Sequence, residues 1–147
     1  MTKNELRAAM RCRNRQLPSE EKAAAAERIF AEVEALPAFG RARCVACFCA
    51  LPDEPPTAEA LRRWSCSKRV VVPRIEGDTM RFYDYRPDAL ICGAFGIEEP
   101  VVAGDSYAGG MGPVDAVEAS SPSPSRESGA FCALCPPESI DLLIVPG

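Results

Sequence analysis

Two dense apolar runs on either side of a short helical pattern constrain the fold of this chain more than any other feature. Residues 44–50 read CVACFCA and residues 69–74 read RVVVPR, and both runs are typical of buried β-strands. Between them, a helix capped by Thr57 is predicted, with its apolar side chains on one face: Ala58, Leu61 and Trp64. Strand, helix and strand within about 30 residues form a βαβ unit. We therefore expect two parallel strands with a right-handed crossover, in an α/β domain.

Further elements complete a single predicted domain over residues 1–147. The patterns favour helices at 3–16 and 20–36, and strands at 80–85 and 140–145. Ser19 is a plausible N-cap of the second helix, while Pro37 and Gly40 are expected to end it. Residues 104–139 contain 5 Gly, 5 Pro and 7 Ser and show almost no periodicity. Because structureless loops this long are uncommon in compact domains, we expect a mobile insertion there.

Composition excludes several classes of function. The chain has 147 residues and a formal net charge of −4, which argues against a protein that coats nucleic acid. No apolar run approaches the roughly 20 residues of a transmembrane helix, and the N-terminus lacks the apolar core of a signal peptide. We therefore expect a cytoplasmic protein with no nucleic-acid or membrane partner.

The chain contains no histidine. Ser-His-Asp and Cys-His catalysis are therefore excluded, as is any metal site that uses imidazole. Acid–base chemistry falls to carboxylates, lysine, tyrosine or the substrate itself.

Eight cysteines raise the question of a zinc site, because Cys44 and Cys47, like Cys132 and Cys135, have the spacing of half-sites. Side chains three apart on a strand point to opposite faces, however. Cys44 and Cys47 are therefore not expected to converge on one ion, and most of the cysteines are expected to be plain buried or free thiols. We predict no metal ligand in this chain.

Basic side chains recur every four residues along the first predicted helix: Lys3, Arg7, Arg11 and Arg15. They form one stripe, which could bind phosphates through the point charge of lysine and the bidentate fork of arginine. A solvated helix face explains the same spacing. Nucleic acid is a third and weaker alternative, because no aromatic residues are interleaved for base stacking.

Charged residues also follow the two strands of the βαβ unit. In parallel sheets, ligands bind at the carboxyl ends of strands. Asp53 and Glu54 follow the first strand and could accept hydrogen bonds from an N–H-rich ring, or could simply precede the helix that begins near Thr57. Arg74 closes the second strand and is a candidate for anion contact. The sequence contains no GxGxxG motif and no P-loop.

Several motifs together resemble the 5-formyltetrahydrofolate cyclo-ligase family, also called methenyltetrahydrofolate synthetase. In chain order they are Lys3-Asn-Glu-Leu-Arg7, Leu17-Pro-Ser-Glu-Glu21, Phe48 through Glu54, Val72-Pro73-Arg74, Met80-Arg-Phe-Tyr, Phe95-Gly-Ile-Glu-Glu-Pro100 and Asp141-Leu-Leu-Ile-Val-Pro-Gly147. Each is weak alone, but their order and spacing cover nearly the whole chain apart from 104–139. The resemblance implies a three-layer αβα fold with a mostly parallel sheet.

The resemblance also implies a reaction and its site. The family closes 5-formyltetrahydrofolate to 5,10-methenyltetrahydrofolate with ATP and Mg²⁺. By this resemblance, the ATP-binding residues are Lys3, Asn4, Glu5, Leu6 and Arg7. The folate-binding residues are Arg7, Cys49, Glu54, Met80 and Phe95, with Glu54 holding the pterin ring. Arg74 assists with anions, and Cys49 stands where the family usually has a larger apolar residue. No catalytic residue is assigned in this chain.

The sequence departs from the family pattern after Val-Pro-Gly147, where relatives continue into a glycine-rich basic loop and Tyr-Tyr-Asp. We therefore expect a sheet incomplete at the C-terminus, no main phosphate loop and no magnesium carboxylate. A full-length form is expected to be a monomeric cyclo-ligase, whereas these 147 residues alone are expected to turn over poorly. The alternative is a non-catalytic folate- or nucleotide-binding remnant of the family.

Overall fold

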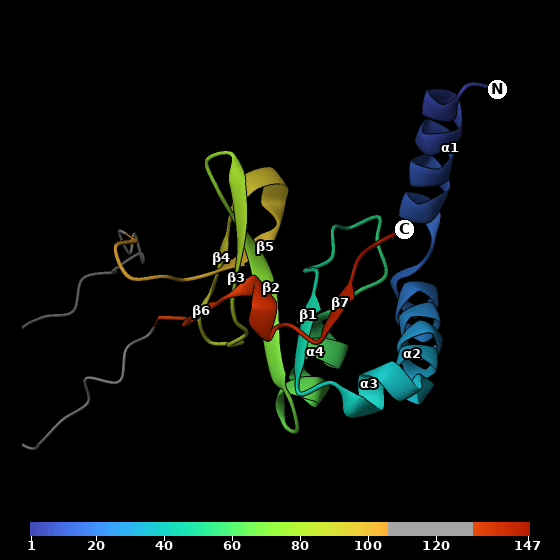
Figure 1. Ribbon diagram of the computed structural model, residues 1–147. Helices are drawn as coiled ribbons and strands as arrows, with labels where there is room; N and C mark the ends of the chain where they lie inside the picture. Colours follow the sequence, from blue (N-terminus) through green and yellow to red (C-terminus); the bar gives the residue numbers. More distant parts are fainter. Residues whose placement is uncertain (106–130) are drawn as a thin grey trace, which may run out of the picture.

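The computed structural model describes residues 1–105 and 131–147 and shows an α/β fold (Figure 1). The helices are α1 Lys3–Gln16, α2 Ser19–Ala35, α3 Pro37–Arg41 and α4 Ala58–Ser65, with the 3-10 turns η1 Ala94–Gly96 and η2 Pro137–Ser139. The strands are β1 Cys44–Cys47, β2 Arg69–Glu76, β3 Thr79–Asp84, β4 Leu90–Cys92, β5 Glu98–Pro100, β6 Leu134–Cys135 and β7 Leu142–Ile144. No helix in the described ranges is long and apolar enough to cross a membrane.

The main sheet has the strand order β6-β3-β2-β1-β7. β1 pairs in parallel with β2 on one side and with β7 on the other, so that Val45 lies beside both Val70 and Leu142. The predicted parallel pair and the α/β class are confirmed. β3 returns antiparallel to β2 through a hairpin at Gly77, whose φ of 59° favours glycine, and β6 pairs antiparallel with β3. β4 and β5 form a separate two-stranded sheet.

Helices α2, α3 and α4 pack on one face of the main sheet. Phe30, Phe39 and Trp64 meet there, with the Trp64 ring centroid 5.5 Å from that of Phe30 and 5.0 Å from that of Phe39. Val45 and Val72 supply the sheet side of this core and are fully buried. Burial of such side chains stabilises a domain by roughly 1.5–3 kcal/mol each, so this face holds much of the stability of the protein.

The opposite face of the sheet has its own small core, made of Cys44, Ala46, Val71 and Cys135 with Phe82 and Ile140 against them. Cys44 therefore faces away from Cys47, which packs under the helices, as the strand periodicity predicts. Within the described residues no α-helix contributes to this second core. The expected second helical layer is thus not seen in the part of the chain that the structure describes.

Helix boundaries differ in two places from the prediction. α1 begins and ends as expected, but α2 starts at Ser19 with Pro18 in the N-cap position and no side-chain cap. Pro37 does not simply end α2, because it begins the new helix α3. Proline suits the first turn of a helix, where the missing N–H has no partner in any case.

The glycine- and serine-rich stretch 104–139 is only partly described. Residues 106–130 lie outside the described residues, so the expected insertion stays a prediction there. Residues 131–139 were also expected to lack regular structure, but they contain β6 and η2. The reason lies in partners distant in sequence: Cys132 donates a backbone hydrogen bond to Val101, and the strand that follows pairs with β3.

Candidate functional site

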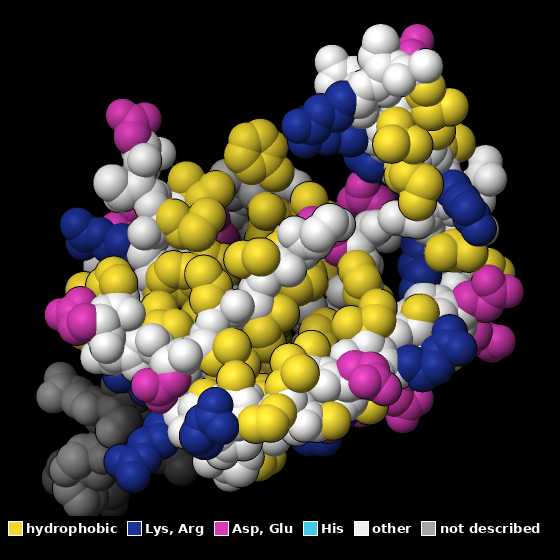
Figure 2. Space-filling view, turned by 45° about the vertical axis from the view of Figure 1, so that its right-hand side comes forward, with side chains coloured by type: hydrophobic (Ala, Val, Ile, Leu, Met, Phe, Trp, Pro, Cys, Tyr) yellow, Lys and Arg dark blue, Asp and Glu magenta, His cyan; other side chains and the backbone are white. Residues whose placement is uncertain are grey.

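The segments that carry the predicted site residues lie at one end of the sheet. α1, the loop after β1, the β2–β3 hairpin and η1 all extend toward the top of Figure 1, beyond the carboxyl ends of β1 and β7. Figure 2 shows hydrophobic side chains gathered beside the hollow between α1, the arm at the upper right, and the rest of the molecule. This is the end of a parallel sheet at which ligands bind in α/β proteins.

The loop over residues 48–57 is closed by its own hydrogen bonds. The Glu54 carboxylate accepts a hydrogen bond from Leu51 N at 2.8 Å, and Glu54 N donates to Leu51 O at 3.0 Å. The Thr57 hydroxyl accepts from Ala50 N at 3.1 Å, so it ties the loop ends together and does not cap α4. The bond to Leu51 uses Oε2 of Glu54, and Oε1 has no hydrogen bond within the described residues.

Asn14 and Lys22 hold this loop against the N-terminal helices. Asn14 Nδ2 donates to Asp53 O at 3.3 Å, and Lys22 Nζ donates to Pro52 O at 3.1 Å. A cavity of about 190 Å³ lies at the junction, and Glu54 lines it. The C-terminal end of α1 and Glu54 therefore share one side of the molecule.

The predicted ATP-binding residues Lys3, Asn4, Glu5, Leu6 and Arg7 occupy the first turns of α1 and are exposed. Glu5 belongs to a capping box with Thr2, and the backbone hydrogen bond from Thr2 is the main cause that lowers the pKa of its carboxyl. Within the described residues, Lys3 and Arg7 form no ion pair with the body.

Cys49 is buried and lines a cavity of about 130 Å³ above the end of β1. Tyr85, Leu90 and Glu98 lie on the other walls. Burial raises the pKa of the Cys49 thiol to about 12, with smaller contributions from the charges of Glu98 and Glu99. The thiol is therefore protonated at neutral pH and can serve as a small apolar wall but not as a nucleophile.

Met80 and Phe95, which are predicted to line the folate site, are both exposed to solvent. Met80 is 57% exposed on β3 and Phe95 is 85% exposed on η1. Phe95 has a φ of 59°, a left-handed conformation that is uncommon outside glycine. Both residues lie toward the end of the sheet described above, but neither lines one of the cavities described in this section.

Arg74 is already engaged inside the protein. Its guanidinium forms two hydrogen bonds with the Asp105 carboxylate, at 2.6 and 2.7 Å, and one with Pro100 O at 2.9 Å. The bond to Asp105 is the main cause that raises the pKa of Arg74, and the same bond lowers the pKa of Asp105. A ligand anion would have to displace Asp105 to reach Arg74.

Glu99 is a residue that the sequence reasoning missed. It is 7% exposed, and in the described residues Glu99 and Thr57 are the buried polar or charged side chains. Its position within the Phe95–Pro100 motif was the available signal, since an acidic residue inside an apolar turn requires a partner.

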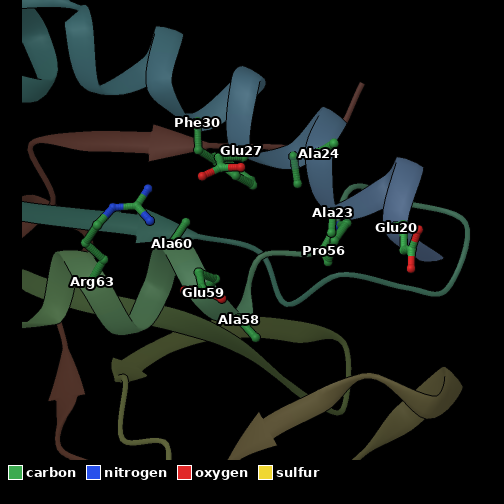
Figure 3. A pocket seen from close by; sticks show the side chains of 11 residues that line it. Glu20, Ala23, Ala24, Glu27, Phe30, Pro56, Ala58, Glu59, Ala60 and Arg63 are labelled. Atoms are coloured by element: carbon green, nitrogen blue, oxygen red, sulfur yellow. The ribbon is translucent and has the colours of Figure 1, made fainter.

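A cavity larger than these two lies elsewhere, between α2 and α4. It measures about 620 Å³ and includes Ala24, Phe30 and Ala60, with Arg63 at its edge (Figure 3). None of the predicted site residues lines it. In the described ranges, no group of three or more His, Cys, Asp or Glu side chains could hold a metal ion.

Both a family model and solved structures match this chain. A model of the 5-formyltetrahydrofolate cyclo-ligase family matches residues 1–108. Among solved structures, the NMR structure of 5,10-methenyltetrahydrofolate synthetase from Aquifex aeolicus is 25% identical in sequence and superposes with a TM-score of 0.68. The match covers 99% of this chain but 60% of the Aquifex chain, so this chain spans three fifths of that protein. No curated protein matches.

Proposed function

The chain belongs to the 5-formyltetrahydrofolate cyclo-ligase family, and from this we propose that it binds 5-formyltetrahydrofolate and ATP at the carboxyl end of β1. The reaction that we propose is ATP-dependent closure to 5,10-methenyltetrahydrofolate. The observation that carries the proposal is the position of Glu54, which the loop 48–57 holds beside the C-terminal end of α1.

The proposed chemistry needs positioning more than a protein base. The formyl oxygen attacks the γ-phosphate of ATP and releases ADP. The second folate nitrogen then attacks the activated carbon, and the C–O bond breaks to expel phosphate. Such phosphoryl transfer depends on charge neutralisation and alignment, which suits a chain without histidine.

Each predicted residue has a defined part in this proposal. Glu54 Oε1 accepts hydrogen bonds from the pterin ring, while Oε2 keeps its bond to Leu51 N. Lys3 and Arg7 neutralise phosphate charge from the exposed face of α1. The apolar walls of the proposed folate site are Met80, Phe95 and the thiol of Cys49.

Magnesium enters this proposal only as an ion bound to ATP phosphates, which it would neutralise. The described residues do not fit a protein-held metal, because no carboxylate cluster occurs among them. No step is assigned to a metal ligand of this chain. We also propose that the protein is cytoplasmic and monomeric.

Binding of each ligand to the purified chain tests the proposal. Titration calorimetry should show binding of 5-formyltetrahydrofolate, and Glu54→Gln should weaken it about tenfold or more, since a hydrogen bond to a charged group contributes about 1.5–3 kcal/mol. Glutamine keeps an oxygen that can accept from Leu51 N, so the loop should persist. Glu59→Gln, an exposed carboxylate in the first turn of α4, is the matched control. Equal affinities for the two variants would contradict the pterin role of Glu54.

A non-catalytic folate- or nucleotide-binding protein is the second candidate, and it is favoured by the engagement of Arg74 with Asp105, which occupies a guanidinium expected to contact anions. It predicts folate binding without formation of methenyltetrahydrofolate. Absorbance of the methenyl product, followed with ATP and Mg²⁺ present, separates the two candidates. Turnover at a rate typical of a complete synthetase would exclude the second.

A further inference from the structure

Glu99 joins the two elements that carry the predicted folate walls. Its Oε1 accepts a hydrogen bond from Ile75 N at 3.3 Å, and Ile75 lies opposite Met80 in the β2–β3 hairpin. One end of the Glu99 carboxylate therefore contacts the strand pair that presents Met80.

The other end of the same carboxylate contacts the turn that presents Phe95. A Cβ placed on Gly93 would lie 2.2 Å from Glu99 Oε2, which is far closer than two non-bonded heavy atoms can approach. Gly93 thus provides the space for the carboxylate. Gly93 N also donates to Ile97 O at 2.7 Å, which closes the turn around Phe95.

The burial of Glu99 calls for an explanation, because a buried carboxylate is costly without hydrogen bonds or a nearby cation. Arg74 is the nearby cation: after Asp105, the charges of Glu99 and Glu76 contribute to its raised pKa. An apolar residue at position 99 would fill the space without this cost. Such a residue could not accept the hydrogen bond from Ile75 N, so the carboxylate makes a link that an apolar side chain cannot make.

We propose that Glu99 is a positioning residue, which holds Phe95 and Met80 at the spacing needed to bind the folate between them. The proposal rests on the proposed function, since it concerns the same site. Glu99 itself need not touch the substrate, because it is only 7% exposed.

A double-mutant cycle tests the link in the full chain. Glu99→Ala should weaken 5-formyltetrahydrofolate binding about tenfold, whereas in a Phe95→Ala, Met80→Ala background the same change should weaken it less than about twofold. Glu99→Gln should restore most of the affinity, because an amide oxygen can accept from Ile75 N. Glu32→Gln on the exposed face of α2 is the control and should leave the affinity unchanged. Equal losses in both backgrounds would overturn the proposal.

Amide hydrogen exchange supplies a readout without ligand. Exchange at Ile75 and at residues 95–97 should accelerate about tenfold or more together in Glu99→Ala and in Gly93→Ala, and should stay near the wild-type rate in Glu99→Gln. Gly93→Ala displaces the carboxylate and keeps the charge, so it covers the case in which Glu99→Ala does not fold. Unchanged exchange overturns the link even where the chain binds no folate. Absent folate binding with coupled exchange would instead count against the proposed function alone.

Discussion

Charged residues near the carboxyl ends of the parallel strands differ in whether they have partners inside the protein. Arg74 forms two hydrogen bonds with Asp105, whereas Lys3 and Arg7 are exposed along α1. Glu54 combines both uses, because one of its oxygens closes a loop and the other has no partner in the described residues. Substitution of the exposed Lys3 or Arg7 should therefore affect ligand binding without affecting folding.

Arg7→Ala should lower the affinity for ATP with little effect on thermal stability. Loss of a charge-assisted hydrogen bond to phosphate costs about 1.5–3 kcal/mol, which is roughly a 10- to 100-fold change in Kd. The measurement is calorimetric titration with ATP. Arg28→Ala on the exposed face of α2 removes an equal charge and should have no effect. If both variants bind ATP like the wild type, the cationic stripe is a solvated helix face.

The cysteines should divide into a reactive group and an unreactive group. Cys12, Cys66 and Cys92 are exposed, and the other five are buried. Burial raises the pKa of Cys47 to about 12, with a smaller contribution from Cys49. A raised pKa leaves less thiolate at any given pH, so these thiols should react slowly even at pH 8.

A colorimetric thiol reagent checks this division. Three thiols should react quickly in the folded protein at pH 8, and all eight should react in denaturant. Fast reaction of more than three thiols would show that the core around β1 opens readily.

At the scale of elements, long periodic segments and dense apolar runs were predictable, whereas several short elements without such a run were not. The apolar spacing in α2 and the dense runs of β1 and β2 report a buried face directly, because they repeat over several residues. Strands such as β5 and β6 have three and two residues, which is too short for any period to show. Their positions depend on partners distant in sequence.

The candidate site was predictable only in part for the same reason. The loop after β1 follows from the βαβ pattern, so the place of Glu54 could be foreseen. The burial of Glu99 could not, since it depends on the space at Gly93 and on the approach of β2 to β5. The pairing of Arg74 with Asp105 likewise joins residues 31 positions apart.

One carboxylate connects helices α2 and α4. Glu34 Oε1 accepts hydrogen bonds from Arg63 Nε at 3.0 Å and from Trp64 Nε1 at 2.7 Å. Burial alone would raise the pKa of Glu34, but the hydrogen bonds from Arg63 and Trp64 outweigh it and keep the pKa below its usual value.

Glu34→Ala should therefore lower the free energy of unfolding by about 1–2 kcal/mol at pH 7, since it leaves Trp64 Nε1 without its acceptor. Because the pKa of Glu34 is lower in the folded than in the unfolded protein, ionised Glu34 stabilises the fold at any pH above its unfolded-state pKa. This stabilisation is lost as the pH falls through its folded-state pKa. The difference between variant and wild type should thus shrink on acidification below about pH 4. Urea titrations at pH 7 and pH 3.5 measure it. If the difference in free energy of unfolding is the same at both pH values, the charge of Glu34 does not contribute to stability.

At the scale of the whole molecule, the sheet is built around β1, which has parallel neighbours on both sides. β7 lies at one margin, and within residues 1–105 and 131–147 no strand pairs with its outer side. Leu143 is 52% exposed there and Val145 is 66% exposed. Free backbone donors and acceptors beside apolar side chains are the usual template for strand addition between molecules.

The unpaired edge of β7 should therefore limit the solubility of the purified chain. Leu143→Lys should raise the saturation concentration, measured by light scattering, although it reduces the size of the net charge of −4. Ala31→Lys, exposed on α2, changes the net charge equally and should not help. A chain with this margin would precipitate by pairing of sheet edges from neighbouring molecules rather than through loss of its folded core.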